Sequence, residues 1–390
     1  MQNRKLIRIT TVPISLQFLL PGQMKFMSEN AFEVLMISAD GKERETVMQN
    51  ENCKHEIVAF TRKITPLTDL KCLWQLIKIF KKEKPDIVHT HTPKAGLLGM
   101  MAAKICGVKL RIHTVAGMPL MVNTGAKLHL LKFIEKLTYA SANYVWPNSF
   151  SLLDYIKKNN FTSTKKLNII NQGSSNGIDL KRFSKNNLDS KIIEEIKNTI
   201  GYNEKNIYLL SIGRLVKDKG IVELVNVFKK LQKNNSHLKL LLLGTFENDL
   251  DPLPLNIVEE IKNNKNIIHV EWTKQVQYYF SIANLFIFAS HREGFPNVLL
   301  QSGAMGLPIV CSAITGNIDI VENNKTGLLF DVGNENQIEE KIMFALAHKN
   351  KMQQMAVDLQ NNIETNFDRK KIWSSILDEY KKLLSLHGAA

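Results

Sequence analysis

Residues 285–301 read LFIFASHREGFPNVLLQ. The apolar run at the start favours a strand that ends at Ala289, a loop with glycine and proline follows over 290–296, and a helix is expected to start near Asn297. The N–H groups in the first turn of a helix have no partner within it, so this helix N-terminus is a natural anion-binding site. Such a strand–loop–helix unit favours an α/β fold with a parallel sheet.

Two side chains of this stretch could contact a ligand bound there. Glu293 lies in the loop and Gln301 lies on the helix just behind it. Both could reach hydroxyl groups of a ligand whose phosphates rest on the helix end. The alternative is that Glu293 is only a partner of the helix dipole.

A second strand–loop–helix unit lies earlier in the chain. The apolar run IYLLSI is followed by GRLVKDKG over residues 213–220, and a helical pattern comes next. Arg214 offers a planar fork of donors and Lys219 a point charge, and together they suit a diphosphate. The alternative is a solvated basic turn.

The same alternation of β-rich runs and amphipathic segments extends along all 390 residues, and this length favours two domains. We expect an N-terminal Rossmann-like domain over 1–183, a linker with one helix over 184–206, a C-terminal Rossmann-like domain over 207–366, and a final helix within 367–390 that returns to the first domain. Ligands in such sheets bind beyond the carboxyl ends of the strands, here in a central cleft that the two domains face. The expected strands are Leu6–Val12, Val34–Ser38, Glu56–Phe60, Asp86–Thr90, Leu110–Thr114, Tyr144–Pro147, Leu167–Ile170, Ile207–Ile212, Lys239–Leu243, Ile267–Val270, Leu285–Phe288 and Pro308–Cys311.

The composition is typical of a cytoplasmic globular protein, with 44% hydrophobic residues. Its 4 cysteines lack metal-ligand spacing and are expected to be reduced, buried thiols. No signal-peptide pattern opens the chain, and no apolar run approaches the roughly 18 residues that span a bilayer. The sequence thus predicts a cytoplasmic protein.

The positive charge lies entirely in the first half of the chain. Residues 1–183 hold 27 Lys and Arg against 13 Asp and Glu, whereas residues 184–390 hold 24 of each. This asymmetry favours an anionic partner for the first half, such as a membrane face, a phosphate-bearing acceptor or nucleic acid. The alternative, a generally lysine-rich genome, does not account for a neutral second half. Nucleic acid is disfavoured because the basic half lacks interleaved aromatic residues and recognised binding modules.

In their order and spacing, the two loops resemble those of the family 4 glycosyltransferases, which have the GT-B fold. The resemblance implies that Arg214 and Lys219 contact the donor diphosphate, and that Glu293 binds the sugar. Gln301 departs from the family's second Glu, which binds ribose, so it keeps an acceptor oxygen but loses the charge. On this basis Glu293, Arg214 and Lys219 are the candidate catalytic residues, and the candidate donor-binding residues are Gly213, Gly294, Phe295, Pro296, Asn297, Val298, Gln301 and Asn176.

Further motifs extend the resemblance over roughly residues 1–345. Asn176-Gly177-Ile178-Asp179 is similar to the family's N-G-I-D turn, and the segment DIVHTH over 86–91 is similar to its D-I-V-H-x-H strand end. The segments around Gly22 and 173–179 resemble members that assemble bacterial surface polysaccharides. Ala116 stands where the family carries a histidine near the anomeric centre. His91, His113 and Gly22 are therefore candidate contacts to acceptor or donor.

No metal site is predicted. Asp249 and Asp251 imitate a D-x-D metal motif, but they lie in a proline-rich loop and are expected to form a solvated turn. His89 and His91 could bind zinc, although no third ligand is suggested nearby.

The resemblance implies a retaining glycosyltransferase that needs no metal or other cofactor. Its donor would be a nucleoside diphosphate sugar, a UDP-sugar, and its acceptor a saccharide linked to polyprenyl diphosphate in capsule or O-antigen synthesis. The apolar and cationic faces of 70–84 and 127–136 could rest on the inner face of the cell membrane; alternatively, the apolar faces are core. A nucleotide-sugar epimerase of the same fold and a catalytically silent partner subunit are the alternative functions.

Overall fold

The computed structural model describes residues 4–247, 249 and 251–388, and the chain divides into two compact units. Unit 1 contains Met1–Asn176 together with Arg369–Ala390, and unit 2 contains Gly177–Asp368. This division falls earlier than the boundary expected after residue 183. Phe183 and Ile196 are buried in a core of unit 2, so the segment expected as a linker is packed into that unit.

Unit 1 is built on a parallel sheet of six strands in the order β3-β2-β1-β4-β5-β6. Successive side chains of a strand point to opposite faces: Leu6 enters the core under α1, α2, α3 and α15, and Ile7 enters the core under α4, α5, α6 and α7. The elements are β1 Arg4–Ile9, α1 Pro13–Leu19, α2 Gln23–Glu29, β2 Phe32–Ser38, α3 Arg44–Glu51, β3 Lys54–Ile57, α4 Pro66–Glu83, β4 Ile87–His91, α5 Pro93–Ile105, β5 Leu110–Val115, α6 Gly125–Ser141, β6 Tyr144–Pro147, α7 Phe150–Lys158 and α15 Arg369–Gly388.

Unit 2 repeats this architecture with the strand order β12-β11-β10-β7-β8-β9. One face of its sheet packs on α9, α10 and α13, and the other on α8, α11, α12 and α14. The elements are α8 Ser190–Thr199, β7 Ile207–Ile212, α9 Ile221–Asn234, β8 Leu238–Leu243, α10 Leu255–Asn263, β9 Ile267–Val270, α11 Val276–Ile282, β10 Leu285–Phe288, α12 Asn297–Ala304, β11 Ile309–Ser312, β12 Leu328–Phe330, α13 Glu335–Ala347 and α14 Lys349–Asn366.

In each unit the strand order reverses direction at one point. This switch lies between β1 and β4 in unit 1 and between β7 and β10 in unit 2. In doubly wound sheets the loops at the carboxyl ends of two such strands diverge and leave a crevice for ligand. The two predicted donor loops follow β7 and β10, so the topology places them at the switch of unit 2.

Two strand predictions differ from the structure. The segment Leu167–Ile170 is not a strand, since it contributes only an isolated parallel bridge between Val145 and Leu167. Conversely, Leu328–Phe330 forms the edge strand β12, which is not among the strands expected from the sequence. Both segments lie at sheet edges, where a strand is short and its hydrophobic pattern is weak.

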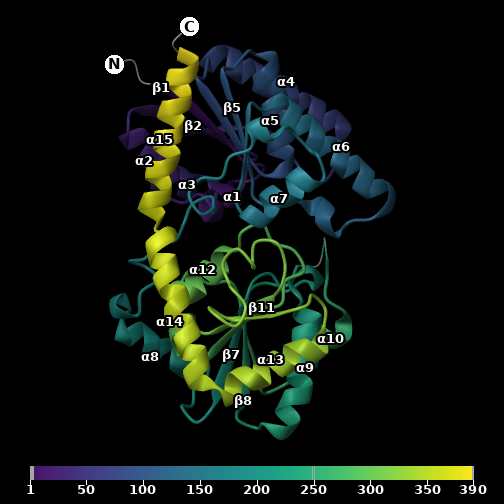
Figure 1. Ribbon diagram of the computed structural model, residues 1–390, viewed down its shortest axis with the longest axis vertical. Helices are drawn as coiled ribbons and strands as arrows, with labels where there is room; N and C mark the ends of the chain where they lie inside the picture. The colour runs from purple at the N-terminus through teal and green to yellow at the C-terminus, as the bar shows by residue number, and fades with distance from the viewer. Residues whose placement is uncertain (1–3, 248, 250, 389–390) are drawn as a thin grey trace. The chain divides into compact units, whose positions relative to one another are not determined.

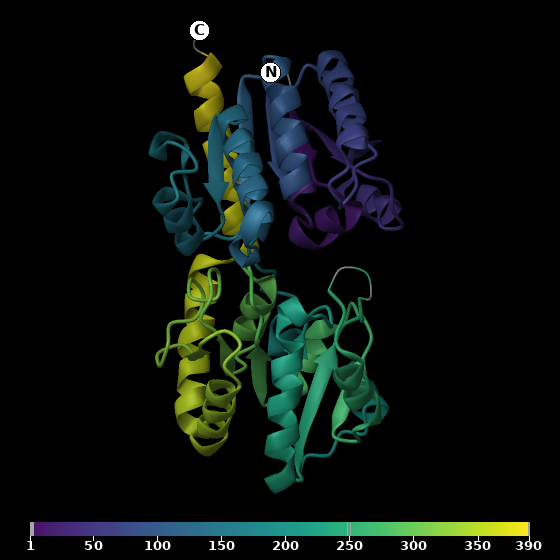
Figure 2. The same ribbon diagram turned by 90° about the vertical axis from the view of Figure 1, so that its right-hand side faces the viewer.

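The last helix, α15, belongs to unit 1, as expected. It is drawn in yellow beside the sheet of unit 1 in Figures 1 and 2. Ile372, Ile376, Tyr380 and Leu383 recur along it at helical spacing and are buried in the core with Met24 and Trp146. No helix of the described residues combines the length and apolar character needed to cross a bilayer.

Candidate functional site

The two predicted donor loops meet in unit 2. Strands β7 and β10 are paired in the sheet, so their carboxyl ends lie at the same edge. Lys219, in the loop after β7, places its Nζ 2.5 Å from Oε1 of Glu293, in the loop after β10. Ser290 Oγ donates to the same carboxylate oxygen at 3.0 Å. One oxygen of Glu293 is therefore fixed by two donors.

Close backbone approach holds these loops together. At Gly220, with φ +66°, a Cβ atom would lie 2.1 Å from the carbonyl oxygen of Ala289. At Gly316, with φ +87°, a Cβ atom would lie 2.4 Å from the carbonyl oxygen of Gly294. Side chains at either glycine would push the loops apart, so both positions require glycine.

Further ion pairs brace the same loops. Arg292 Nη2 lies 2.9 Å from Asp218 Oδ2, and His291 Nε2 lies 2.7 Å from Glu223 Oε1. The hydrogen bond to Glu223 raises the pKa of His291, more than burial lowers it. Asp251 Oδ2 accepts from the backbone N–H of Asp218 at 2.6 Å, so Asp251 supports the loop after β7 and is not simply solvated. Leu250, the middle residue of the D-x-D motif, lies outside the described residues.

Arg214 lies on the same loop as Lys219 but has a different partner. Its guanidinium forms an ion pair with Glu247, and 47% of its side chain is exposed. Gly213, just before it, packs tightly on the next loop: a Cβ atom at Gly244 would lie 1.9 Å from the Gly213 carbonyl oxygen. Arg214 is thus held by a carboxylate at the surface, where an incoming anion could replace that partner.

The N-terminus of α12 follows Glu293. The helix starts at Asn297, and its N-cap residue, Pro296, provides no side-chain cap. Asn297, Val298 and Gln301 are half-buried. Phe295 is only 7% exposed and packs against Phe367, with ring centroids 5.4 Å apart, so its ring serves the core of unit 2.

The remaining predicted residues lie in unit 1. Asn176 accepts from Gln23 Nε2 at 3.0 Å and from Trp373 Nε1 at 2.6 Å, and it donates to the Pro21 carbonyl oxygen at 3.1 Å. Its amide therefore joins α2, α15 and the 173–176 turn.

Gly22 also has structural partners. Its N–H donates to Glu51 Oε1 at 2.6 Å, and its φ is +82°. A Cβ atom there would lie 2.6 Å from the indole ring of Trp373.

His91 and His113 differ in their surroundings. His113 is buried against Gly96 on the α5 face and contacts Thr90 Oγ1 through Nδ1 at 2.8 Å. His91 contacts the guanidinium of Arg8 through Nε2 at 2.8 Å. Burial lowers the pKa of His113 to about 4, and burial together with Arg8 lowers the pKa of His91 well below its usual range. Both imidazoles are therefore neutral near pH 7.

Sequence reasoning missed several residues of these clusters. No recognisable motif points to Ser290, Glu247 or Arg8. Their hydrogen-bond partners lie 3, 33 and more than 80 positions away in the chain, respectively. Among the described residues, no group of three or more histidine, cysteine, aspartate or glutamate side chains could hold a metal ion.

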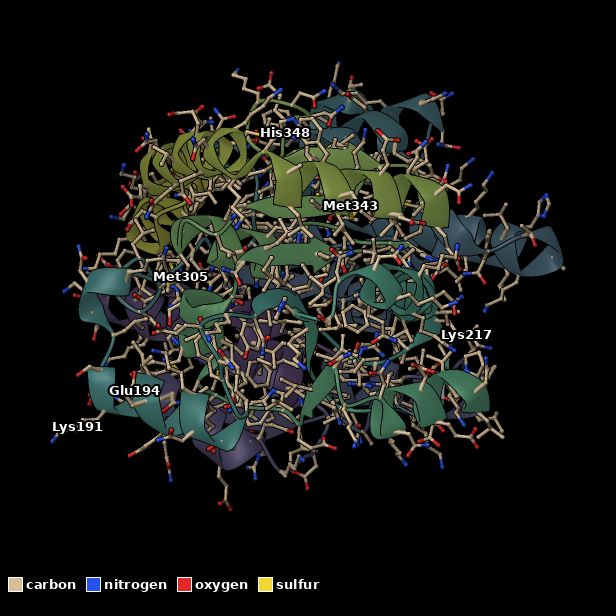
Figure 3. All side chains as sticks on the ribbon, turned by 90° about the horizontal axis from the view of Figure 1, so that it is seen from below. Lys191, Glu194, Lys217, Met305, Met343 and His348 are labelled. Atoms are coloured by element: carbon tan, nitrogen blue, oxygen red, sulfur yellow. The ribbon has the colours of Figure 1, made fainter. Side chains whose placement is uncertain are left out.

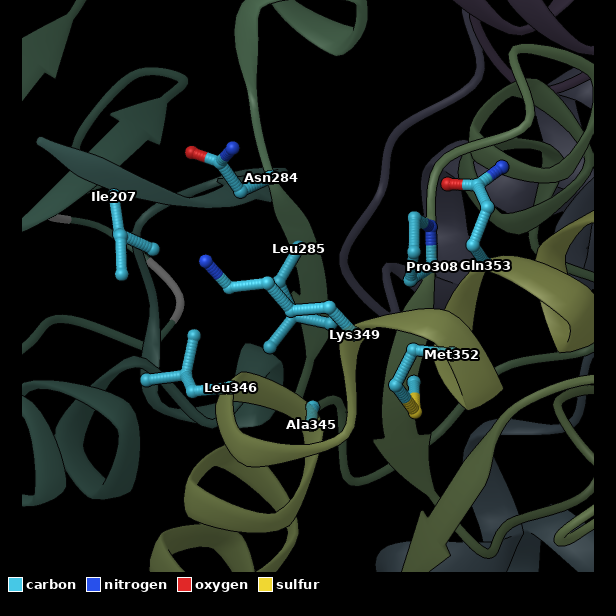
Figure 4. Close-up of a pocket in the computed structure, with 9 residues that line it drawn as sticks. All are labelled: Ile207, Asn284, Leu285, Pro308, Ala345, Leu346, Lys349, Met352 and Gln353. Atoms are coloured by element: carbon cyan, nitrogen blue, oxygen red, sulfur yellow. The ribbon is translucent and has the colours of Figure 1, made fainter. Parts of the chain in front are cut away.

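A separate cavity of unit 2, of about 190 Å³, lies at the amino ends of β7, β10 and β11 (Figure 4). Ile207, Leu285 and Pro308 form part of its wall, at the edge of the sheet opposite Glu293. None of its lining side chains has a buried polar atom without a partner. It therefore does not belong to the site of Lys219 and Glu293.

Two family models match the chain. Residues 192–361 match the model described as glycosyl transferases group 1, and residues 17–149 match the model described as glycosyl transferase 4-like. The first match contains the loops with Lys219 and Glu293, and the second contains Gly22, His91 and His113.

Curated relatives are similar along most of the chain. The chain is 32% identical over 389 residues to the capsular polysaccharide biosynthesis glycosyltransferase CapM of Staphylococcus aureus, with 98% of either protein covered. It is 27% identical over 333 residues to the UDP-Gal:alpha-D-GlcNAc-diphosphoundecaprenol alpha-1,3-galactosyltransferase of Escherichia coli, with 82% of this chain and 81% of the relative covered.

Solved structures share the fold. HepE of Anabaena in complex with UDP and glucose gives a TM-score of 0.79 at 15% identity, covering 97% of this chain and 100% of HepE. A glycosyltransferase from Rickettsia africae gives a TM-score of 0.78 at 18% identity, covering 98% of this chain and 99% of that structure. At these identities the likeness concerns the fold, which is the one expected from the sequence.

Proposed function

The chain belongs to the family 4 glycosyltransferases of the GT-B fold, and from this membership we propose that it transfers a sugar from a UDP-sugar to a lipid-linked saccharide in the synthesis of a surface polysaccharide. The observation that carries the assignment of the site is the Lys219–Glu293 ion pair beside the open N-terminus of α12. The relatives from Staphylococcus aureus and Escherichia coli, named for capsule synthesis and for transfer to a diphosphoundecaprenol-linked sugar, support the acceptor class.

The leaving group of this reaction is a nucleoside diphosphate, and stabilising its charge is the main electrostatic task. We assign that task to Lys219, Arg214 and the first N–H groups of α12. Lys219 is 17% exposed, so its charge acts in a partly dry environment where it is screened less than at the surface. These groups can carry out the task without a metal ion, and the proposed reaction uses none.

Glu293 is assigned to the transferred sugar. Lys219 and Ser290 both hold Oε1, which leaves Oε2 to accept a hydrogen bond from a sugar hydroxyl. Gln301 and the residues of the 294–298 segment are assigned to the nucleotide side of the donor. Since Ala116 stands where the family carries a histidine, we assign the acceptor proton to the departing phosphate oxygen, on the face where the new bond forms. That geometry retains the anomeric configuration.

Asn176, Gly22, His91 and His113 remain candidate contacts to donor or acceptor. Each already has partners within unit 1: Asn176, Gly22 and His91 in hydrogen bonds, and His113 against Thr90 and Gly96. Any such contact would therefore be made by a side chain or backbone group that is already fixed in place.

We assign the acceptor's lipid carrier to the basic unit 1. On α4, Leu67, Leu70 and Trp74 are 53–81% exposed, whereas Leu76 and Phe80 are core. On α6, Phe133 is 63% exposed, and Lys127 and Lys136 of the same helix are exposed as well. Exposed apolar side chains flanked by lysines suit an anionic membrane surface at the inner face of the cell membrane.

The reaction is tested by incubating the protein with a panel of UDP-sugars, with and without a polyprenyl-diphosphate-linked saccharide. Acceptor-dependent release of UDP supports transfer. Isomerisation of the donor would instead show the epimerase alternative, and donor binding without turnover would show a silent partner subunit. The glycosyltransferase relatives favour transfer over both alternatives.

The membrane contact is tested separately by sedimentation with phosphatidylglycerol-containing and pure phosphatidylcholine vesicles. Binding should require the anionic lipid, and Trp74→Glu should weaken it. Leu255→Glu is the matched control, because Leu255 is 80% exposed but lies on α10 of unit 2. Equal binding to both kinds of vesicle would contradict the assignment.

A further inference from the structure

Arg8 is a buried cation at the switch point of unit 1. It lies on β1 opposite His89 of β4 and is 1% exposed. Its Nη1 contacts His89 Nδ1 at 2.7 Å and donates to the hydroxyl of Tyr380. Its Nη2 contacts His91 Nε2 at 2.8 Å and donates to Gln23 Oε1. All four Nη hydrogens thus have partners.

This arrangement determines which nitrogen of each histidine carries the proton. A guanidinium only donates, so His89 Nδ1 and His91 Nε2 must both accept. A neutral imidazole then carries its proton on the other nitrogen. For His89 this is Nε2, which lies 2.7 Å from Thr114 Oγ1. For His91 it is Nδ1, and this buried N–H has no partner among the described residues.

Two more buried polar atoms near His91 also lack partners. They are Trp146 Nε1, a donor, and Asn148 Oδ1, an acceptor. His91, Trp146 and Asn148 are at most 5% exposed and line the same cavity, which has a volume of about 20 Å³. Ile170 and Ser175 also line this cavity, at its rim, and are only half-buried. Three unpaired polar groups around one small space are unusual in a folded protein, because each forgoes a hydrogen bond that water would supply.

We propose that this cavity is a binding site for a single hydroxyl-type oxygen, which accepts from His91 Nδ1–H and Trp146 Nε1–H and donates to Asn148 Oδ1. The volume admits an oxygen atom of that size but no sugar ring. An oxygen that both accepts and donates matches two donors and one acceptor, whereas a carboxylate or phosphate oxygen would leave the Asn148 acceptor unpaired. Two sources share this chemistry: an internal water, and a hydroxyl of a saccharide whose ring stays at the rim.

The first test uses the unmodified full chain and needs no activity. Nitrogen-15 labelling of histidine should show His91 protonated on Nδ1 and His89 on Nε2. A crystal structure should show density for one oxygen in the cavity. Finding His91 protonated on Nε2, or a cavity without density, would overturn the proposal.

The second test distinguishes the two sources. Crystals are soaked with methyl α-glucoside as a saccharide probe. Isolated density that the soak leaves unchanged identifies water, and density that becomes continuous with a sugar ring at Ile170 identifies a saccharide hydroxyl. Either result supports the site, and neither depends on the proposed transfer reaction.

A matched pair of variants tests the role of Asn148. Asn148→Leu should fill the cavity, expel the oxygen and shift the His91 Nδ1–H resonance. Asn159→Leu makes the same change at the end of α7, outside the cavity lining, and should leave that resonance in place. An unshifted His91 resonance in Asn148→Leu would contradict the proposal.

Discussion

The ammonium group of Lys219 lies 2.5 Å from Oε1 of Glu293, although the two residues are 74 positions apart in the chain. The ion pair joins the loop after β7 to the loop after β10. It joins the charge assigned to the donor diphosphate with the carboxylate assigned to the donor sugar. Loss of either side chain should therefore disturb the binding of both the diphosphate and the sugar.

We expect Lys219→Met to lower kcat by about 10²-fold or more, the loss typical of removing one donor that stabilises transition-state charge. Glu293→Gln should lower kcat/KM for the sugar donor while leaving UDP binding largely intact. Because the residues touch, the effects in the double variant should not add. Steady-state kinetics with the same donor and acceptor measure all three.

Lys217 provides the control for charge. It lies on the same loop, is exposed and is labelled in Figure 3. Lys217→Met should retain near-normal activity. Equal losses of kcat in Lys217→Met and Lys219→Met would show that only the net charge of the loop matters.

Arg214 should act through its planar fork of donors. We expect Arg214→Ala to lower kcat/KM by at least about tenfold, and Arg214→Lys to recover only part of this, since lysine keeps the charge without the fork. Glu247→Gln should strengthen UDP binding modestly, because the carboxylate that pairs with Arg214 is removed. Calorimetric titration with UDP checks both effects, and unchanged turnover in Arg214→Ala would identify the loop as a solvated basic turn.

Gly22 should be required for stability. In Gly22→Ala, the new Cβ atom meets Trp373 at 2.6 Å and the backbone keeps φ +82°, so we expect a loss of about 1–3 kcal/mol in the free energy of unfolding. Gly107→Ala is the control, because Gly107 has φ +68° but open space around it. Denaturant unfolding of both variants separates the clash from the backbone strain, and equal losses would contradict a role for the Trp373 contact.

Glu135 on α6 should make stability depend on pH. Burial raises its pKa to about 7, above the usual value of 4.5. Between these values the unfolded chain loses the proton while the folded chain keeps it, so the free energy of unfolding falls as pH rises from about 4.5 to 7. Glu135→Gln should remove this dependence and be more stable than the parent at pH 8, by up to about 3 kcal/mol. A parent chain that is no less stable at pH 8 than the variant would contradict the assignment.

The α/β class, the central strands and the two loop motifs could be predicted from the sequence alone. Strands such as Ile207–Ile212 and Leu285–Phe288 occur as expected, because a buried parallel strand is a continuous apolar run bounded by turn residues. The loop motifs with Lys219 and Glu293 could also be recognised in the sequence, since each is one contiguous stretch of residues. The weak edge strand Leu328–Phe330 and the place of residues 184–206 could not, because side chains distant in sequence decide them.

The partners of those residues follow from the tertiary structure. It pairs Lys219 with Glu293 and Arg214 with Glu247. It also brings Asn176 and Gly22 into contact with Trp373 of the last helix. It also buries Arg8, whose hydrogen bond to His91 Nε2 sets the tautomer of that imidazole. The physical reason is that a hydrogen bond or an ion pair depends on distance in space, whereas hydrophobic periodicity reports only which face of an element is buried.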